Sequence, residues 1–295
     1  MKTLINFTTS SDDLSRYRDT EDLRQFCRQY HCDGLELMPM DTDRERFVPT
    51  DLVVGIHANC YSDWMGTDRA SLINHYRKDL DFARNIQAEY VVFHVTQVSF
   101  QETLTYQTSH TDAEVVDAAA DLINALLDGQ DYHFYFLMEN LWWPGLNFLN
   151  PSITKRLLDQ IHYEKKGFML DTGHYMNTNT KLRTASEATA YLHAMLDCHE
   201  EMIPMIKGLH LCQSLSGSYV ENYRKNPDLP CTDPEKLFRQ AFEHIFRIDQ
   251  HLPFEDPGVI GLLRRIDPLY VTLEYITKNR RQHEEYLLRG TKYLP

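Results

Sequence analysis

Three features are missing from the sequence: a Cys-x-x-Cys pair, an apolar run of 18 residues, and a run of Lys and Arg longer than two residues. Without such a pair, the six cysteines form no dithiol redox or zinc-ribbon motif. Without the apolar run, we expect no membrane-spanning helix. Residues 8–18 are polar and leave no apolar core for a secretory signal, so we expect a cytoplasmic protein.

Acidic residues outnumber basic residues by 43 to 30, which gives a formal net charge of −13. This charge disfavours a nucleic-acid or anionic-membrane partner, because both are polyanions. Hydrophobic residues make up 42% and charged residues 25%, which excludes disordered, collagen-like and coiled-coil classes. No Pro-, Gly- or Ser-rich linker divides the 295 residues, so we expect one domain over residues 1–295.

Short apolar segments alternate with longer amphipathic ones along the whole chain. The apolar segments are residues 3–7, 34–38, 52–56, 90–95, 134–138, 167–170, 206–211 and 269–273. The helix-like stretches are residues 21–30, 69–85, 112–127, 153–161, 185–202, 234–246 and 280–288. Eight such units predict an α/β fold, a (β/α)8 TIM barrel with buried parallel strands. A doubly wound open sheet is the alternative, but the glycine-rich first turn of that fold is absent after residue 7.

Ionisable side chains stand where these apolar segments end. They are His57, His94, Glu139, Asp171, His210 and Glu274, while Glu36 lies within an earlier segment. Each residue taken alone is better explained by a loop hydrogen bond or a helix cap than by a metal site. In a barrel, however, all strand ends meet at one face, where so many charges would need a cation. Histidine with carboxylates is the ligand set of zinc or manganese.

Two local motifs add ligands. Asp171-Thr172-Gly173-His174 places a carboxylate and an imidazole three residues apart, across what we expect to be a tight turn at the glycine. Asp249-Gln250-His251 places two ligands on one side of an extended segment. The alternative for the second motif is a solvated loop, so that motif alone does not establish a site.

These strand ends and motifs, in this order, resemble the xylose isomerase-like TIM barrels, in particular the endonuclease IV (AP endonuclease family 2) branch. The resemblance rests on Gly55-Ile56-His57, Phe93-His94, Met138-Glu139-Asn140, Leu170-Asp171-Thr172-Gly173-His174, Gly208-Leu209-His210-Leu211, Ile248-Asp249-Gln250-His251 and Leu273-Glu274. It implies one to three divalent cations, zinc or manganese. The first would be bound by His57, His94 and Glu139, the second by Glu139, Asp171, His210 and Glu274, and the third by His174, Asp249 and His251. Sugar isomerases of the superfamily chiefly need the second set.

The strand-end loops carry no basic residues to hold DNA, since residues 8–13 and 38–43 are neutral to acidic. They carry aromatic residues instead, including all three tryptophans. The substrate-binding candidates are Tyr61, Trp64, Trp142, Trp143 and Tyr175, with Glu36 as either a substrate ligand or a support for a metal ligand. The alternative is that these rings pack on one another at the barrel mouth. The run Trp142-Trp143-Pro144-Gly145 is similar to bacterial members that include a cobamide-remodelling amidohydrolase branch.

The expected function is a metal-dependent hydrolase that cleaves a phosphoester or amide bond in a small-to-medium organic substrate, such as a cobamide. Glu139 would bridge two cations. The alternative is a sugar isomerase or epimerase in which Glu139 and Glu274 exchange a proton with the substrate. A DNA endonuclease and a non-catalytic binding module are weaker alternatives. The sequence predicts no oligomeric state.

Overall fold

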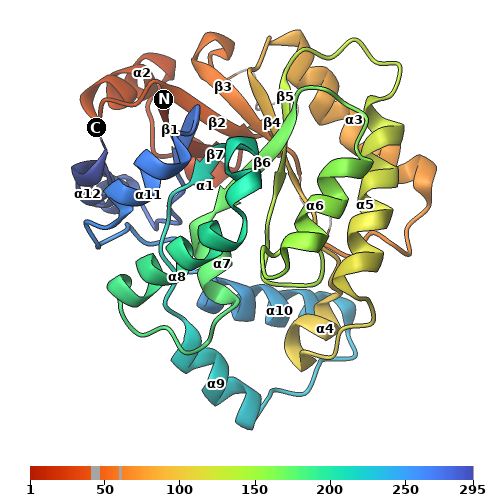
Figure 1. Ribbon diagram of the computed structural model, residues 1–295. Helices are drawn as coiled ribbons and strands as arrows, with labels where there is room; N and C mark the ends of the chain where they lie inside the picture. Colours follow the sequence, from red (N-terminus) through yellow and green to blue (C-terminus); the bar gives the residue numbers. More distant parts are fainter. Residues whose placement is uncertain (41–46, 60–61, 295) are drawn as a thin grey trace.

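The computed structural model describes residues 1–40, 47–59 and 62–294. In this part of the chain eight parallel strands close into a barrel in the order β1 to β8, with β8 pairing to β1 (Figure 1). The strands are β1 (Lys2–Thr8), β2 (Gly34–Met38), β3 (Val53–His57), β4 (Tyr90–His94), β5 (Tyr135–Glu139), β6 (Lys166–Asp171), β7 (Ile206–His210) and β8 (Tyr270–Leu273). The predicted (β/α)8 barrel is confirmed.

Helices surround the strands. The α-helices are α1 (Ser11–Leu14), α2 (Thr20–Gln29), α3 (Arg69–Asn85), α4 (Phe100–Thr105), α5 (Asp112–Leu127), α6 (Pro151–Gln160), α7 (Thr172–Asn177), α8 (Ala185–Cys198), α9 (Gly217–Lys225), α10 (Pro234–Ile248), α11 (Val259–Ile266) and α12 (Arg280–Gly290). Short 3-10 helices are η2 (Thr50–Leu52), η3 (Glu200–Met205) and η4 (Thr291–Tyr293). No helix of the described chain is long and apolar enough to cross a membrane.

The helix expected over residues 185–202 is shorter than predicted. Helix α8 ends at Cys198, and the chain continues as the 3-10 helix η3, which contains Pro204. His199 caps the end of α8, because its backbone N–H donates to Met195 O and Leu196 O and its ring Nδ1 lies 2.9 Å from Met195 O. The connection between β7 and α10 contains a further helix, α9, that is not among the predicted helix-like stretches.

The barrel interior is filled below the strand ends. Leu4, Val54, Tyr90, Val92, Leu137, Met169 and Tyr270 form a buried inner cluster. Tyr90 occupies the space left by Gly55, where a Cβ atom would lie 2.1 Å from the Tyr90 Cζ atom. The Tyr90 hydroxyl donates to Glu36 Oε2 at 2.6 Å, at the upper limit of this cluster. Above this apolar cluster, polar side chains such as Glu36 line the barrel interior toward the carboxyl ends of the strands, where barrels of this type carry their sites.

Helices α4, α9 and α10 lie together at the bottom of the view in Figure 1 and follow the carboxyl ends of β4 and β7. We call these three helices the cover. His244 of α10 connects them, because its two ring nitrogens contact the hydroxyls of Tyr106, just after α4, at 2.9 Å and of Tyr219, in α9, at 2.6 Å. Phe100 of α4 also packs against Phe238 of α10, with ring centroids 5.4 Å apart. The cover is therefore a packed unit at the end of the barrel that carries the charged residues.

Candidate metal centre

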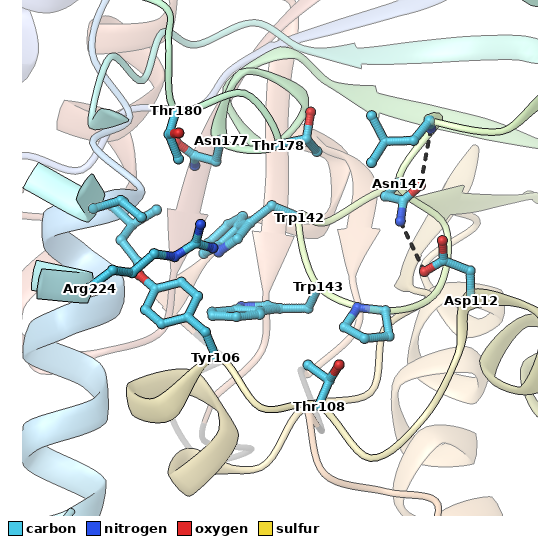
Figure 2. Close-up of a pocket in the computed structure, with 14 residues that line it drawn as sticks. Tyr106, Thr108, Asp112, Trp142, Trp143, Asn147, Asn177, Thr178, Thr180 and Arg224 are labelled. Carbon is cyan, nitrogen blue, oxygen red and sulfur yellow. Dashed lines mark hydrogen bonds between the residues drawn. The ribbon is translucent and has the colours of Figure 1, made fainter. Parts of the chain in front are cut away.

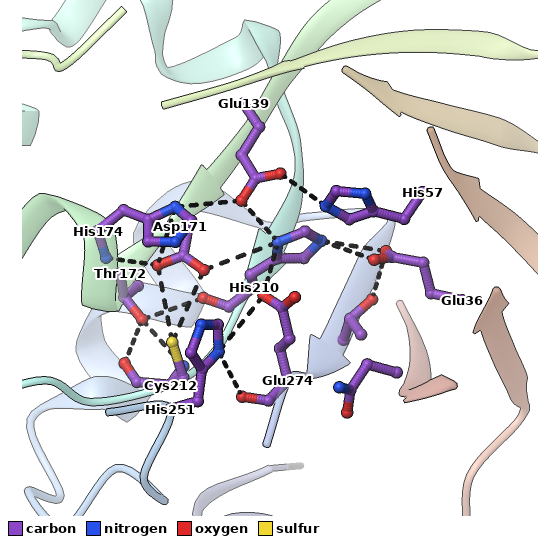
Figure 3. A network of polar contacts seen from close by, with 12 residues as sticks. Glu36, His57, Glu139, Asp171, Thr172, His174, His210, Cys212, His251 and Glu274 are labelled. Atoms are coloured by element: carbon purple, nitrogen blue, oxygen red, sulfur yellow. Dashed lines mark hydrogen bonds and ion pairs between the residues drawn. The ribbon is translucent and has the colours of Figure 1, made fainter. Parts of the chain in front are cut away.

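The nine predicted ligands gather at the carboxyl ends of the strands. The candidate groups of ligand atoms include the three predicted ones: His57, His94 and Glu139; Glu139, Asp171, His210 and Glu274; and His174, Asp249 and His251. Two further groups are Glu36, His57 and His210, and Asp171, Cys212 and His251. In each group the ligand atoms lie within 4.8 Å of one another. Figure 3 shows most of these side chains pointing toward a common centre. Strand ends far apart in sequence thus supply one cluster, as the barrel predicts.

Glu139, the last residue of β5, faces two of the groups with different oxygens. Its Oε2 lies 3.1 Å from His57 Nε2 and 3.0 Å from His94 Nε2. Its Oε1 lies 3.1 Å from His210 Nδ1, which is also 3.0 Å from Glu274 Oε2. The carboxylate is fully buried. Glu139 could therefore serve as a ligand in both groups if each group held a cation.

Two local backbone features position the third group of His174, Asp249 and His251: the end of helix α10 at Asp249 and the left-handed conformation of His251. Asp249 is the C-cap of α10, and its Oδ2 lies 3.1 Å from His174 Nε2 and 2.6 Å from His251 Nε2. His251 has a φ of 44°, a left-handed conformation that is strained for a residue other than glycine. A negative side chain at a helix C-terminus is electrostatically unfavourable, so the two imidazoles, or a cation, must offset that cost.

The prediction of a tight turn at Gly173 is wrong. Residues 172–177 form helix α7, and Asp171 is its N-cap, with Oδ1 accepting from the His174 backbone N–H at 2.6 Å. The glycine is needed for space rather than for backbone freedom, because a Cβ there would lie 2.7 Å from Cys212 Sγ. The helix start fixes the spacing of Asp171 and His174.

Four ligand imidazoles have an acceptor behind their second nitrogen, as expected for metal ligands. His57 Nδ1 faces Ala58 O at 3.0 Å, His174 Nδ1 faces Asn140 O at 2.9 Å, and His251 Nδ1 faces Glu274 O at 3.1 Å. His210 Nε2 lies 2.9 Å from Glu36 Oε1. These contacts direct the other ring nitrogen of each histidine toward the cluster, so the side chains fit divalent cations such as zinc.

Glu36 is buried beside His210. Its side chain is about 1% exposed. Besides His210, its Oε2 accepts from the Tyr90 hydroxyl and from Thr272 Oγ1 at 2.8 Å. With its oxygens used in this way, Glu36 is positioned to orient the His210 ring, one of the two roles expected for it, and it also forms a candidate metal-binding group with His57 and His210.

The cluster combines opposite charges in a buried place. Burial raises the pKa of Asp171 to about 7. Burial also raises the pKa of Glu139, but His210 and His94 more than offset this and hold it well below its usual value. Burial lowers the pKa of His251, but Asp249 and Glu274 raise it to about 10. The pKa values of His174 and His210 are likewise raised by their carboxylate neighbours, against the effect of burial.

These shifts predict that cation binding releases protons. Below their raised pKa values the imidazoles carry protons that a cation must displace, so affinity should rise with pH, by about tenfold per pH unit for each proton displaced. Titration calorimetry with Zn²⁺ between pH 6 and 8, in two buffers of different ionisation enthalpy, measures the protons released. Proton uptake, or affinity independent of pH, would contradict this prediction.

Comparison with known proteins defines the family. The family described as xylose isomerase-like TIM barrel matches residues 5–294. The chain belongs to this family. No curated protein matches the chain in sequence.

Solved structures of this fold include proteins with different activities. Endonuclease IV from Thermus thermophilus superimposes with a TM-score of 0.58 at 12% identity, over 100% of this chain and 99% of that one. A D-tagatose 3-epimerase-like protein gives 0.57 at 14% identity, over 100% of both chains. The IOLI protein, in a structure with a zinc atom, gives 0.58 at 13% identity, over 99% of this chain and 96% of that one. At such identities the likeness shows the shared fold and leaves the reaction open.

The predicted aromatic substrate contacts are only partly brought together. Trp142 and Trp143 line a cavity of about 330 Å³ under the cover (Figure 2). Trp64 is 4% exposed and its indole N–H donates to Thr96 O at 2.6 Å. Tyr175 is 4% exposed and stacks on Tyr191, with centroids 4.5 Å apart. These two residues pack as the alternative predicted, and Tyr61 lies outside the described residues.

Sequence reasoning did not find the polar residues of this cavity, which include Tyr106, Asn147, Asn177 and Arg224. None of them ends a strand. Arg224 lies in α9, within the long connection between β7 and β8. The length of that connection was the available signal, since barrels build sites from loops at this end.

Proposed function

We propose that the protein is a hydrolase that uses up to three divalent cations, Zn²⁺ first and Mn²⁺ as the alternative, to cleave a phosphoester or amide bond. The observation that carries this proposal is the complete third group, His174, Asp249 and His251, beside two groups that share Glu139. When bound, such cations act as Lewis acids toward water and toward the oxygen of the bond to be cleaved.

The protein side chains perform the positioning. Glu139 holds its two oxygens toward different ligand groups, and Glu36 fixes the ring of His210. The cavity under the cover has a volume of about 330 Å³, which favours a small-to-medium organic substrate over a DNA duplex. The net charge of −13 favours the same choice, because a duplex would be repelled. A cobamide would enter the cavity of about 330 Å³ only with one part of its structure.

A sugar isomerase or epimerase is the second candidate, because the second group is complete by itself. Glu274 is the group's partly exposed carboxylate, with 14% of its side chain accessible, and it lies across His210 from Glu139. Two carboxylates on either side of a substrate carbon could move a proton between them. This reaction needs one cation and makes no use of the third group.

Metal content and the variant His251→Ala separate the two candidates. For the hydrolase we expect two or three ions per chain, the loss of one ion in His251→Ala, and a fall in hydrolysis. The control is His162→Ala, since His162 is exposed and its ring pairs with Asp128 at the surface. One ion per chain, unchanged by His251→Ala, together with interconversion of ketose epimers, would favour the isomerase. The measurements are elemental analysis and assays with phosphoester, amide and sugar panels.

A further inference from the structure

We propose that the cavity under the cover binds an organic anion, a carboxylate or phosphate attached to a planar ring, through Arg224. This inference names the substrate class for the proposed function and rests on it for the position of the reacting bond. The cavity has a volume of about 330 Å³ and lies between the loop after β5, α7 and α9. That volume is at the lower end of the usual range for small-molecule sites.

Aromatic rings form one side of the cavity. The rings of Trp142 and Trp143 have centroids 5.8 Å apart, and Tyr106 lies 5.5 Å from Trp143 (Figure 2). Trp142 is only partly buried, and its indole nitrogen has no hydrogen-bond partner in the described chain. Flat rings of this kind favour a planar or ring-bearing ligand, which they contact face on or edge on.

Arg224 is the cationic group of the cavity. Its guanidinium lies 4.2 Å from the ring centroid of Tyr106, which fixes its place at the edge of the aromatic wall (Figure 2). Among the described residues no carboxylate forms an ion pair with it, whereas Arg183 nearby pairs with Glu221 at 2.7 Å. In a chain with a net charge of −13, an arginine without a carboxylate partner is available for an anionic ligand.

The carboxylate in the cavity wall does not compete for this arginine. Asp112 Oδ1 accepts from the Asn147 side-chain amide and from the Gly145 backbone N–H, each at 3.0 Å. That carboxylate is used in holding the loop after β5. Guanidinium binds carboxylate and phosphate through two parallel hydrogen bonds, so both are candidate head groups.

The cavity adjoins the third ligand group. Trp142 lies against the ring of His174, with centroids 5.2 Å apart. Asn177 also lines the cavity, and its side-chain amide donates to Asp249 Oδ1 at 3.4 Å. A ligand anchored by Arg224 and stacked on the tryptophans therefore extends toward His174 and Asp249, where the proposed reaction takes place.

Tryptophan fluorescence tests the proposal without turnover. Two of the three tryptophans line the cavity, while Trp64 is buried elsewhere. The probes are phenylphosphonate, which has no ester bond to hydrolyse, phenylacetate and the neutral benzyl alcohol, titrated into metal-loaded protein. We expect one of the two anions to change the emission and to bind about tenfold or more weakly to Arg224→Met, because a charge-assisted hydrogen bond is lost. The anion that binds more tightly identifies the head group.

The matched control is Lys225→Met, which removes the same charge from the next residue of α9. It should bind the anion like the wild type, and benzyl alcohol should bind Arg224→Met and wild type equally. Equal anion binding by Arg224→Met and wild type would overturn the proposal, as would an equal loss in Lys225→Met. A signal that persists in Trp142→Phe/Trp143→Phe would overturn the assignment to this cavity. Anion binding that depends on Arg224 in a protein without hydrolytic activity would contradict only the proposed function.

Discussion

Replacing Glu139 by glutamine is expected to remove the cations of the first two ligand groups from the protein. Glu139 is the residue common to the first two ligand groups, and its oxygens face them separately. The amide has nearly the same size but no negative charge. Loss of a partner behind a ligand lowers metal affinity by about 10–100-fold, and loss of a shared ligand should cost more. Elemental analysis should find at most the ion of His174, Asp249 and His251.

Asp22→Asn is the control for this variant. Asp22 is also a buried carboxylate, but it pairs with Arg280 in the outer layer of the barrel, with a nitrogen–oxygen distance of 2.7 Å. It should retain the metal content of the wild type. If Glu139→Gln also keeps all its ions and its turnover, Glu139 bridges nothing and the proposed arrangement of cations is wrong.

Chelation of the cations is expected to lower the melting temperature by about 5–10 °C. A ligand at 100 times its dissociation constant stabilises the native state by about 2.7 kcal/mol, and 1 kcal/mol corresponds to about 2–4 °C in chains of 150–250 residues. Differential scanning calorimetry with and without EDTA, with readdition of Zn²⁺, measures the effect.

The same measurement on Glu139→Gln provides the control. With two cations already absent, EDTA should lower the melting temperature of this variant by less than that of the wild type. A wild-type melting temperature that EDTA leaves unchanged would mean that the native chain binds no cation tightly, and that the buried charges neutralise one another instead.

The barrel and the gathering of ionisable side chains at its carboxyl end were predictable because both follow from local sequence, whereas the division of these side chains into three ligand groups was implied by the resemblance to the xylose isomerase-like barrels. Apolar segments that end in His57, His94, Glu139, Asp171 and His210 indicate strands whose last residues face one opening. Parallel strands place all those ends at the same edge. The prediction required no knowledge of side-chain contacts, only of strand order.

The remaining parts of the site depend on contacts that sequence does not reveal. The indole N–H of Trp64 donates to the carbonyl of Thr96, 32 residues away. This contact holds the ring in a buried position, although the sequence predicted that Trp64 would bind substrate. Arg224 reaches the cavity because α9 is a helix, although no side chain caps its start and its sequence is mostly polar. His244 holds this helix through Tyr219, a contact set by the packing of the cover.

X-ray diffraction at the zinc and manganese absorption edges, from crystals of protein purified without added metal, tests the central claim most directly. We expect anomalous peaks in two or three of the ligand groups, with Glu139 as a ligand in both of the first two. A refined structure without an anomalous peak among Glu139, Asp171, His210 and Glu274 would contradict the central claim.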